Sequence, residues 1–365
     1  MKEYTFKTRQ IALFFIAFTP LIKFFTMPSL LSSTAKNDLL FSLLIPFTFE
    51  VLTLGIIIFT MKNYNGTFIE FLKEQFGETG FKIVLILYAV CFFAKALLPI
   101  CEQKDYIELT LYQTNTNPLS FLTFILISFY LATKKFRVLG RLSDVCFIIT
   151  LVGYVVLMGL SISNADYGSI LPIGINGIKN IVKGAFSCFT WFGDAVYLLF
   201  FMGNFEYQKK SGKKIFLSYL LSMLLVIIFF YVFYGTFTSI AFRQRFALTE
   251  ISKYSSVINN VGRFDYIAIF LILTANVFSI SIPIYFCCKL LSITLPIKQK
   301  WIYPVIVHVA IFIIITFFRE HFFTIEKLQE NVFSFIYPIF YYVLPTIFCF
   351  MIICKKQLKE GYEKS

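Results

Sequence analysis

The 365-residue sequence is poor in charged residues, which make up only 15% of the chain, whereas hydrophobic residues make up 58%. A soluble protein contains about 25% charged residues. Aromatic residues reach 19%, largely because the chain has 48 phenylalanines. This composition excludes a soluble globular protein and predicts one polytopic membrane domain over residues 1–365, with the lipid bilayer as its surroundings.

Residues that bind metals or act in catalysis are also scarce. The chain has two histidines, His308 and His321, and its eight cysteines form no C-x-x-C pairs. Metal sites usually need such clusters. The sequence also lacks a phosphate-binding glycine loop, a nucleophile motif and a zinc signature. We therefore expect no metal site, no cofactor and no enzymatic activity.

The net charge of +13 does not indicate a nucleic-acid partner, because the basic residues lie mostly in short loops between apolar segments. Of the 33 Lys and Arg residues, 21 fall on one side of the predicted membrane and 10 on the other, with Lys23 and Lys95 inside apolar segments. Basic loops favour the cytoplasmic side of a membrane. We therefore expect a multi-pass protein of the cell membrane with both termini in the cytoplasm.

The chain contains ten apolar segments, most of them long enough to cross a bilayer, which takes about 17–25 residues. They are 11–33, 39–60, 81–101, 117–132, 143–163, 184–204, 215–241, 264–293, 301–318 and 334–354. Ten spans divide into two repeats, about 9–163 and 184–354. Five spans are an odd number, so the second repeat must be inverted relative to the first. The sequence thus predicts an all-α membrane protein with a five-plus-five inverted repeat.

The first and sixth segments are interrupted at mid-depth. Pro20, Lys23 and Pro28 fall within nine positions of the first segment, and Gly193 and Asp194 lie in the middle of the sixth. Proline removes a backbone donor, glycine weakens a helix by about 1 kcal/mol, and a charge at mid-membrane costs at least about 2.5–3.5 kcal/mol. Inverted-repeat transporters bind their substrates at such breaks. We therefore predict that helices 1 and 6 are broken and adjacent.

The candidate ligand-binding residues lie at these two breaks and in the eighth segment. They are Thr19, Pro20, Lys23, Phe192, Gly193, Asp194, Asn276 and Ser279. Lys23 and the N-terminus of a half-helix are expected to meet a ligand carboxylate, and Asp194 a ligand ammonium. Alternatively, Lys23 and Asp194 form a structural ion pair without a ligand. The polar residues of the eighth segment could equally join neighbouring helices.

Glu50 in the second segment and Lys95 in the third are candidates for a proton or charge relay. Glu50 could bind and release a proton, or it could neutralise Lys23 or Lys95. Lys95 could extend its ammonium toward the membrane surface. Alternatively, it lies near the mouth of the pocket and pairs with Glu102.

Several short motifs occur in order along the chain. They are Arg9-Gln10, Met27-Pro28, Ala35-Lys36-Asn37-Asp38, Gly140-Arg141-Leu142-Ser143-Asp144, Phe189-Thr190-Trp191-Phe192-Gly193-Asp194 and Arg263-Phe264-Asp265. Together they resemble the B subunit of the spore germinant receptors, in the endospore germination permease family of the amino acid–polyamine–organocation superfamily. The resemblance covers nearly the whole chain. The first break differs from the family pattern, because Lys23 stands where small residues are usual.

The resemblance implies a membrane subunit of a germinant receptor in the spore inner membrane, with the receptor A and C subunits as partners. Such a subunit binds a small germinant, such as an amino acid, at the midplane and signals germination. The alternative is a proton-coupled transporter of amino acids or other solutes, in which Glu50, Asp194 or Lys23 carries the proton. A third possibility is a structural subunit without a ligand, which a closed, ion-paired midplane would indicate.

Overall fold

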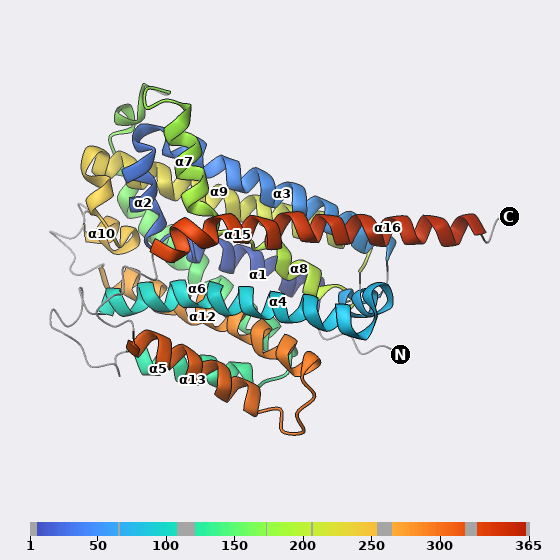
Figure 1. Ribbon diagram of the computed structural model, residues 1–365. Coiled ribbons are helices and arrows are strands. Elements are labelled where there is room, and N and C mark those ends of the chain that lie inside the picture. Colours follow the sequence, from blue (N-terminus) through green and yellow to red (C-terminus); the bar gives the residue numbers. More distant parts are fainter. Residues whose placement is uncertain are drawn as a thin grey trace.

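The computed structural model describes residues 6–64, 66–107, 121–172, 174–205, 207–253, 265–317 and 327–362. These residues form an elongated bundle in which most helices run along one common direction (Figure 1). Helix α1 begins and helix α16 ends at the same end of the bundle. Among the described residues, Phe6 and Phe205 form an isolated β-bridge, which joins the start of the chain to its middle.

The helices follow the chain in two series. The first comprises α1 (Thr8–Leu21), α2 (Met27–Thr34), α3 (Leu39–Asn63), α4 (Phe68–Tyr106), α5 (Leu122–Ala132) and α6 (Arg137–Ser161). The second comprises α7 (Ile178–Cys188), α8 (Ala195–Phe201), α9 (Ser211–Phe237), α10 (Ala247–Lys253), α12 (Asp265–Thr294), α13 (Ile302–Phe317), α15 (Ser334–Pro338) and α16 (Leu344–Tyr362). Shorter helical turns include η6 (Phe189–Trp191) after α7, and η8 (Gln329–Phe333) and η9 (Ile339–Val343) on either side of α15.

In the ranges that the structure describes, seven helical stretches are long and apolar enough to cross a membrane, judged by length and composition. They are Lys36–Asn63, Phe68–Tyr106, Arg137–Gly159, Ile178–Phe201, Ser211–Arg243, Val277–Thr294 and Gln329–Lys355. Three shorter apolar helices, α1, α5 and α13, lie within the other predicted segments. The protein is therefore an all-helical, multi-pass membrane protein. Its count of ten spans and its inverted repeat stay predictions.

The first apolar segment is broken, as predicted. Helices α1 and α2 are separated by residues 22–26, and Pro28 lies in the first turn of α2. Proline suits that position because the first N–H groups of a helix have no partner within the helix. The backbone N–H of Ala247 at the start of α10 donates to the carbonyl of Phe25 at 3.0 Å. Helix α10 thus packs on the break and satisfies one of its free carbonyl groups.

The sixth segment is also broken, between η6 and α8. Gly193 in this break has a φ of +100°, a conformation that only glycine adopts without strain. A methyl group at this position would collide with the ring of Tyr341 in η9. Glycine therefore allows both the turn of the chain and the close approach of η9 to the break.

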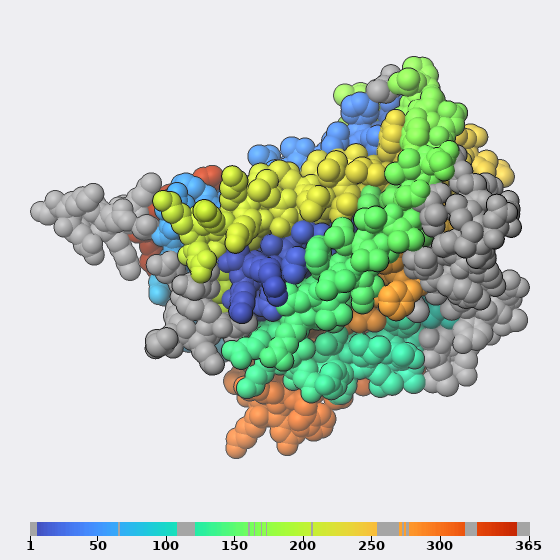
Figure 2. Space-filling view, turned by 180° about the vertical axis from the view of Figure 1, so that it is seen from behind, coloured from blue at the N-terminus to red at the C-terminus, as the bar shows by residue number. Residues whose placement is uncertain are grey.

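The broken helix α1 lies inside the bundle, where it packs against α6, α9 and α12. Figure 2 shows the beginning of α1 (blue) between α9 (yellow) and α6 (green). Helix α4 bends at Gly77, where φ is +68°. Its short first part carries the buried residues Phe68, Phe71 and Leu72. Its long second part packs along α12, so that the breaks are enclosed by α3, α4, α9 and α12.

Candidate functional site

The two breaks are joined by a buried ion pair. Lys23 Nζ lies 2.6 Å from Asp194 Oδ2, and both side chains are completely shielded from solvent. Lys23 Nζ also donates to the carbonyl of Thr19 at 3.3 Å and lies 4.6 Å from the centre of the Phe192 ring. Because an unpaired charge inside the membrane is costly, each of these groups stabilises the other.

The carboxylate of Glu50, on α3, occupies the N-terminal end of α8. Its Oε1 atom accepts the backbone N–H groups of Gly193 and Asp194, the latter at 2.9 Å, and Oε2 accepts that of Ala195 at 2.9 Å. The hydroxyl of Tyr342 donates to Oε1 at 3.1 Å. The first amides of a helix have no partner within the helix. We expected a ligand carboxylate at this half-helix N-terminus, but Glu50 takes that place.

Lys95, on α4, is the second ammonium group of the site. Its Nζ atom donates to the carbonyl of Phe192 and lies 4.0 Å from Asp194 Oδ1. It also lies 4.7 Å from the centre of the Tyr341 ring. Lys95 is only 6% exposed, so it points into the bundle and the alternative in which it reaches the membrane surface is wrong. Both ammonium groups thus approach the carboxylate of Asp194, while the carboxylate of Glu50 binds the amides beside it.

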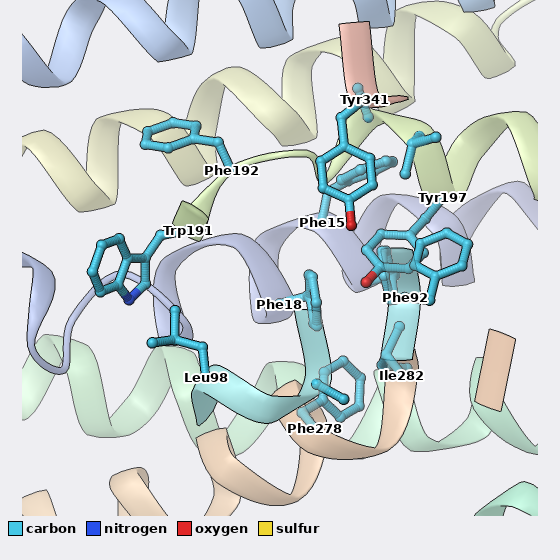
Figure 3. Close-up of a cluster of buried hydrophobic side chains, with 14 of the residues drawn as sticks. Phe15, Phe18, Phe92, Leu98, Trp191, Phe192, Tyr197, Phe278, Ile282 and Tyr341 are labelled. Carbon is cyan, nitrogen blue, oxygen red and sulfur yellow. The ribbon is translucent and has the colours of Figure 1, made fainter. Parts of the chain in front are cut away.

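Aromatic rings lie against both ammonium groups, Phe192 near Lys23 and Tyr341 near Lys95. Figure 3 shows these two rings within a cluster of buried hydrophobic side chains. Tyr197 and Tyr341 both pack against Phe92, with ring centres 5.3 and 6.3 Å from it. Beside them is a cavity of about 20 Å³, which is room for about one water molecule. Its lining residues are Phe18, Ile22, Lys95, Leu98, Pro99, Glu102, Thr190, Trp191 and Ser279.

A second cavity, of about 210 Å³, lies next to the first, since Leu98 and Trp191 line both. Between them, Glu102 accepts the hydroxyl of Thr26 and the indole N–H of Trp191, the latter at 3.1 Å. These hydrogen bonds tie α4 to both breaks. Sequence reasoning gave Trp191 no special role, because an aromatic residue in an apolar segment carries no distinguishing signal.

The structure brings most of the predicted site residues together. Around the ion pair lie Thr19, Lys23, Phe192, Gly193 and Asp194, joined by the predicted relay residues Glu50 and Lys95. Pro20 lies in the last turn of α1, and its carbonyl accepts the N–H of Lys23 at 2.9 Å. Ser279 lines the small cavity, whereas the side chain of Asn276 lies outside the described residues.

Sequence reasoning missed Tyr341 and Tyr342, which contact Lys95 and Glu50. They are two of 21 tyrosines in the chain, and nothing in the sequence distinguishes them from the others. In the part of the chain that the structure describes, no three His, Cys, Asp or Glu side chains gather as they would around a metal ion.

The fold is similar to that of a manganese transporter from Eremococcus coleocola. Crystal structures of two of its mutants each have a TM-score of 0.65 and 13% sequence identity, covering 93% of this chain and 78% of the transporter. Its complex with an aromatic bis-isothiourea substituted compound has a TM-score of 0.63 and 12% identity. At this identity the likeness shows a transporter-type fold alone. Comparison with curated proteins finds no match.

A family model described as "Spore germination protein" matches residues 9–323. The matched range contains both breaks, together with Glu50, Lys95 and the motifs that carry the resemblance noted above. It covers well over half of the sequence and confirms that resemblance. The chain therefore belongs to the spore germination protein family of membrane permeases.

Proposed function

We propose that this protein is the membrane subunit of a spore germinant receptor, and that it binds a small zwitterion such as an amino acid between its two broken helices. The observation that best supports this proposal is the buried pair of Lys23 and Asp194. A zwitterion offers a carboxylate for Lys23 and an ammonium for Asp194. The site is thus complementary in charge to both ends of such a ligand.

Binding would require the site to open. The cavity that Lys95 lines, at about 20 Å³, is too small for an amino acid. An entering ligand would replace the contact between Lys23 and Asp194, while Lys95 stays close to the other oxygen of Asp194. A ligand shifts a conformational equilibrium only through its different affinities for the two states. In this proposal the ion pair exists only in the closed state, in which the two breaks are in contact. The ligand takes the place of that pair, so it binds the open state more tightly than the closed state.

The larger cavity marks the entry route in this proposal. Its lining includes Arg245 and Glu330 as well as Thr26 and Trp191. Trp191 also lines the small cavity, and Thr26 donates a hydrogen bond to Glu102, which lines the small cavity too. A ligand arriving there would meet the site once the hydrogen bonds of Glu102 to Thr26 and Trp191 separate.

The rest of the proposal is supported by the apolar segments and basic loops of the sequence and by the family. The protein would form ten spans in a five-plus-five inverted repeat, lie in the spore inner membrane with both termini in the cytoplasm, and pass the signal to the receptor A and C subunits. It would not be an enzyme, since its family and fold are those of a permease.

Two other functions each have an observation in their favour. The transporter-type fold favours a proton-coupled solute transporter. Uptake by reconstituted vesicles, driven by a pH gradient, would support that function. The closed, ion-paired midplane favours a structural subunit without a ligand. The absence of binding by any small molecule tested would support that one.

The experiment is calorimetric titration of the purified protein with a panel of zwitterionic amino acids. We expect at least one amino acid to bind saturably. Asp194→Asn should weaken its binding at least about tenfold, which corresponds to a loss of about 1.4 kcal/mol of binding free energy. Asp144→Asn is the matched control, because Asp144 pairs with the exposed Arg9 outside the site. The proposal is wrong if no amino acid binds at millimolar concentration, or if Asp194→Asn binds as tightly as the unmodified protein.

A further inference from the structure

A separate cavity of about 550 Å³ lies away from the breaks, between the α5–α6 loop, the end of α12 and the start of α13. It is close to the N-terminal segment. Asn204 lines the cavity and its carbonyl accepts the N–H of Phe6 at 3.3 Å, while the rings of Phe6 and Phe136 lie 4.6 Å apart. The cavity therefore opens at the end of the bundle where α1 begins.

Four lysines line this cavity, and no carboxylate is among its lining residues. They are Lys134, Lys135, Lys289 and Lys300. Among the residues that the structure describes, none of the four forms an ion pair. Like charges around one space repel one another unless an anion lies between them. The cavity is thus complementary to an anionic group.

Apolar and aromatic residues also line the cavity, beside the lysines. Trp301, Tyr303 and Tyr285 line it, and Trp301 is 57% exposed. The adjoining α12–α13 loop exposes Leu295 and Ile297 and projects from the molecule beside α5 (Figure 2, orange). Tryptophan and tyrosine favour the interface between membrane and water. Exposed apolar residues beside lysines fit a molecule that has both an anionic head and apolar chains.

We propose that this cavity binds the headgroup of an anionic phospholipid, with the phosphate among the lysines and the acyl chains along the exposed apolar residues beside them. Its volume is typical of a small-molecule site. Basic pockets between membrane helices are known to hold anionic headgroups. This inference does not depend on the proposed germinant site, because the two share none of their lining residues.

The test uses the two tryptophans of the chain, Trp191 and Trp301. The purified full-length protein is titrated in mixed micelles with phosphatidylglycerol or phosphatidylcholine that carries brominated acyl chains, which quench tryptophan fluorescence. We expect half-maximal quenching at a lower fraction of phosphatidylglycerol than of phosphatidylcholine. Trp301→Phe should remove most of this difference, because Trp191 is buried in the site at the breaks.

Two matched double variants test the lysines. Lys135→Gln with Lys300→Gln should reduce the preference for phosphatidylglycerol at least about tenfold, since each basic residue near an anionic surface contributes about 1 kcal/mol. Lys209→Gln with Lys210→Gln removes the same charge from exposed positions outside the cavity and should leave the preference unchanged. If the first double variant does not fold, the two single variants replace it.

Three results would overturn the proposal. The first is equal quenching by the two lipids, and the second is equal loss of preference in both double variants. The third is binding of inorganic phosphate that depends on Lys135 and Lys300 without any lipid preference, since this would assign the cavity to a free anion.

Discussion

The ammonium of Lys23 and the carboxylate of Asp194 lie 2.6 Å apart although 171 positions separate them in the chain. Each belongs to the non-helical break of a membrane helix, so their contact holds the two breaks together. The same carboxylate lies 4.0 Å from Lys95, and Glu50 holds the backbone on the C-terminal side of the second break. The breaks are therefore held by their own ion pair and by charges on two other helices, α3 and α4.

Glu50 is expected to stabilise the second break through its hydrogen bonds with three backbone amides. Glu50→Ala should lower the free energy of unfolding by at least about 3 kcal/mol, because each buried amide without an acceptor costs about 1–3 kcal/mol. Glu50→Gln, which keeps an acceptor, should lose less. The measurement is thermal unfolding in detergent. Glu74→Ala is the control, since Glu74 pairs with Lys355 at the surface. Equal losses for Glu50→Ala and Glu74→Ala would contradict this role.

Gly193 is expected to tolerate no side chain. Gly193→Ala should destabilise the protein by about 1–3 kcal/mol through backbone strain, with a further loss from the collision with Tyr341. Gly55→Ala is the control, because space around Gly55 in α3 is open and alanine favours a helix by about 1 kcal/mol. Thermal unfolding of the two variants should move in opposite directions. An unchanged midpoint for Gly193→Ala would show that the break adopts another conformation.

Thr26 is expected to act through its hydrogen bond to Glu102. Thr26→Val keeps the size of the side chain but removes the donor, and should lower the free energy of unfolding by about 1–3 kcal/mol. Thr26→Ser keeps the hydroxyl and should lose much less. The two variants are compared by thermal unfolding. If the valine and serine variants lose the same stability, the hydroxyl of Thr26 does not contribute, and the loss comes from the changed shape of the side chain alone.

The breaks could be predicted from the sequence because their signals are rare in apolar segments. Proline, glycine and charge are each unfavourable in the middle of a membrane helix, so Pro20, Lys23, Gly193 and Asp194 stood out. Their closeness followed from the predicted transporter-type repeat. The family resemblance rested on the order of motifs, which the family match confirms.

The partners of Glu50 and Lys95 could not be predicted in the same way. Glu50 was recognised as a deep carboxylate, but its amide partners lie 143–145 positions away and depend on how α3 packs on α8. A lysine side chain is long enough to reach either the surface or the interior. The packing of α4 against the second break decides the direction of Lys95. The roles of Trp191 and Tyr341 likewise depend on packing between distant segments.

The most direct test of the account is a double-mutant cycle on Lys23 and Asp194, measured by the free energy of unfolding of the purified protein. Lys23→Met and Asp194→Asn each leave one unbalanced charge at the breaks and should each lose about 3–5 kcal/mol. The double variant leaves Lys95 and Glu50 in balance and should lose at least about 1 kcal/mol less than the sum of the single losses. Losses that add fully would contradict the claim that these opposite charges hold the two breaks together.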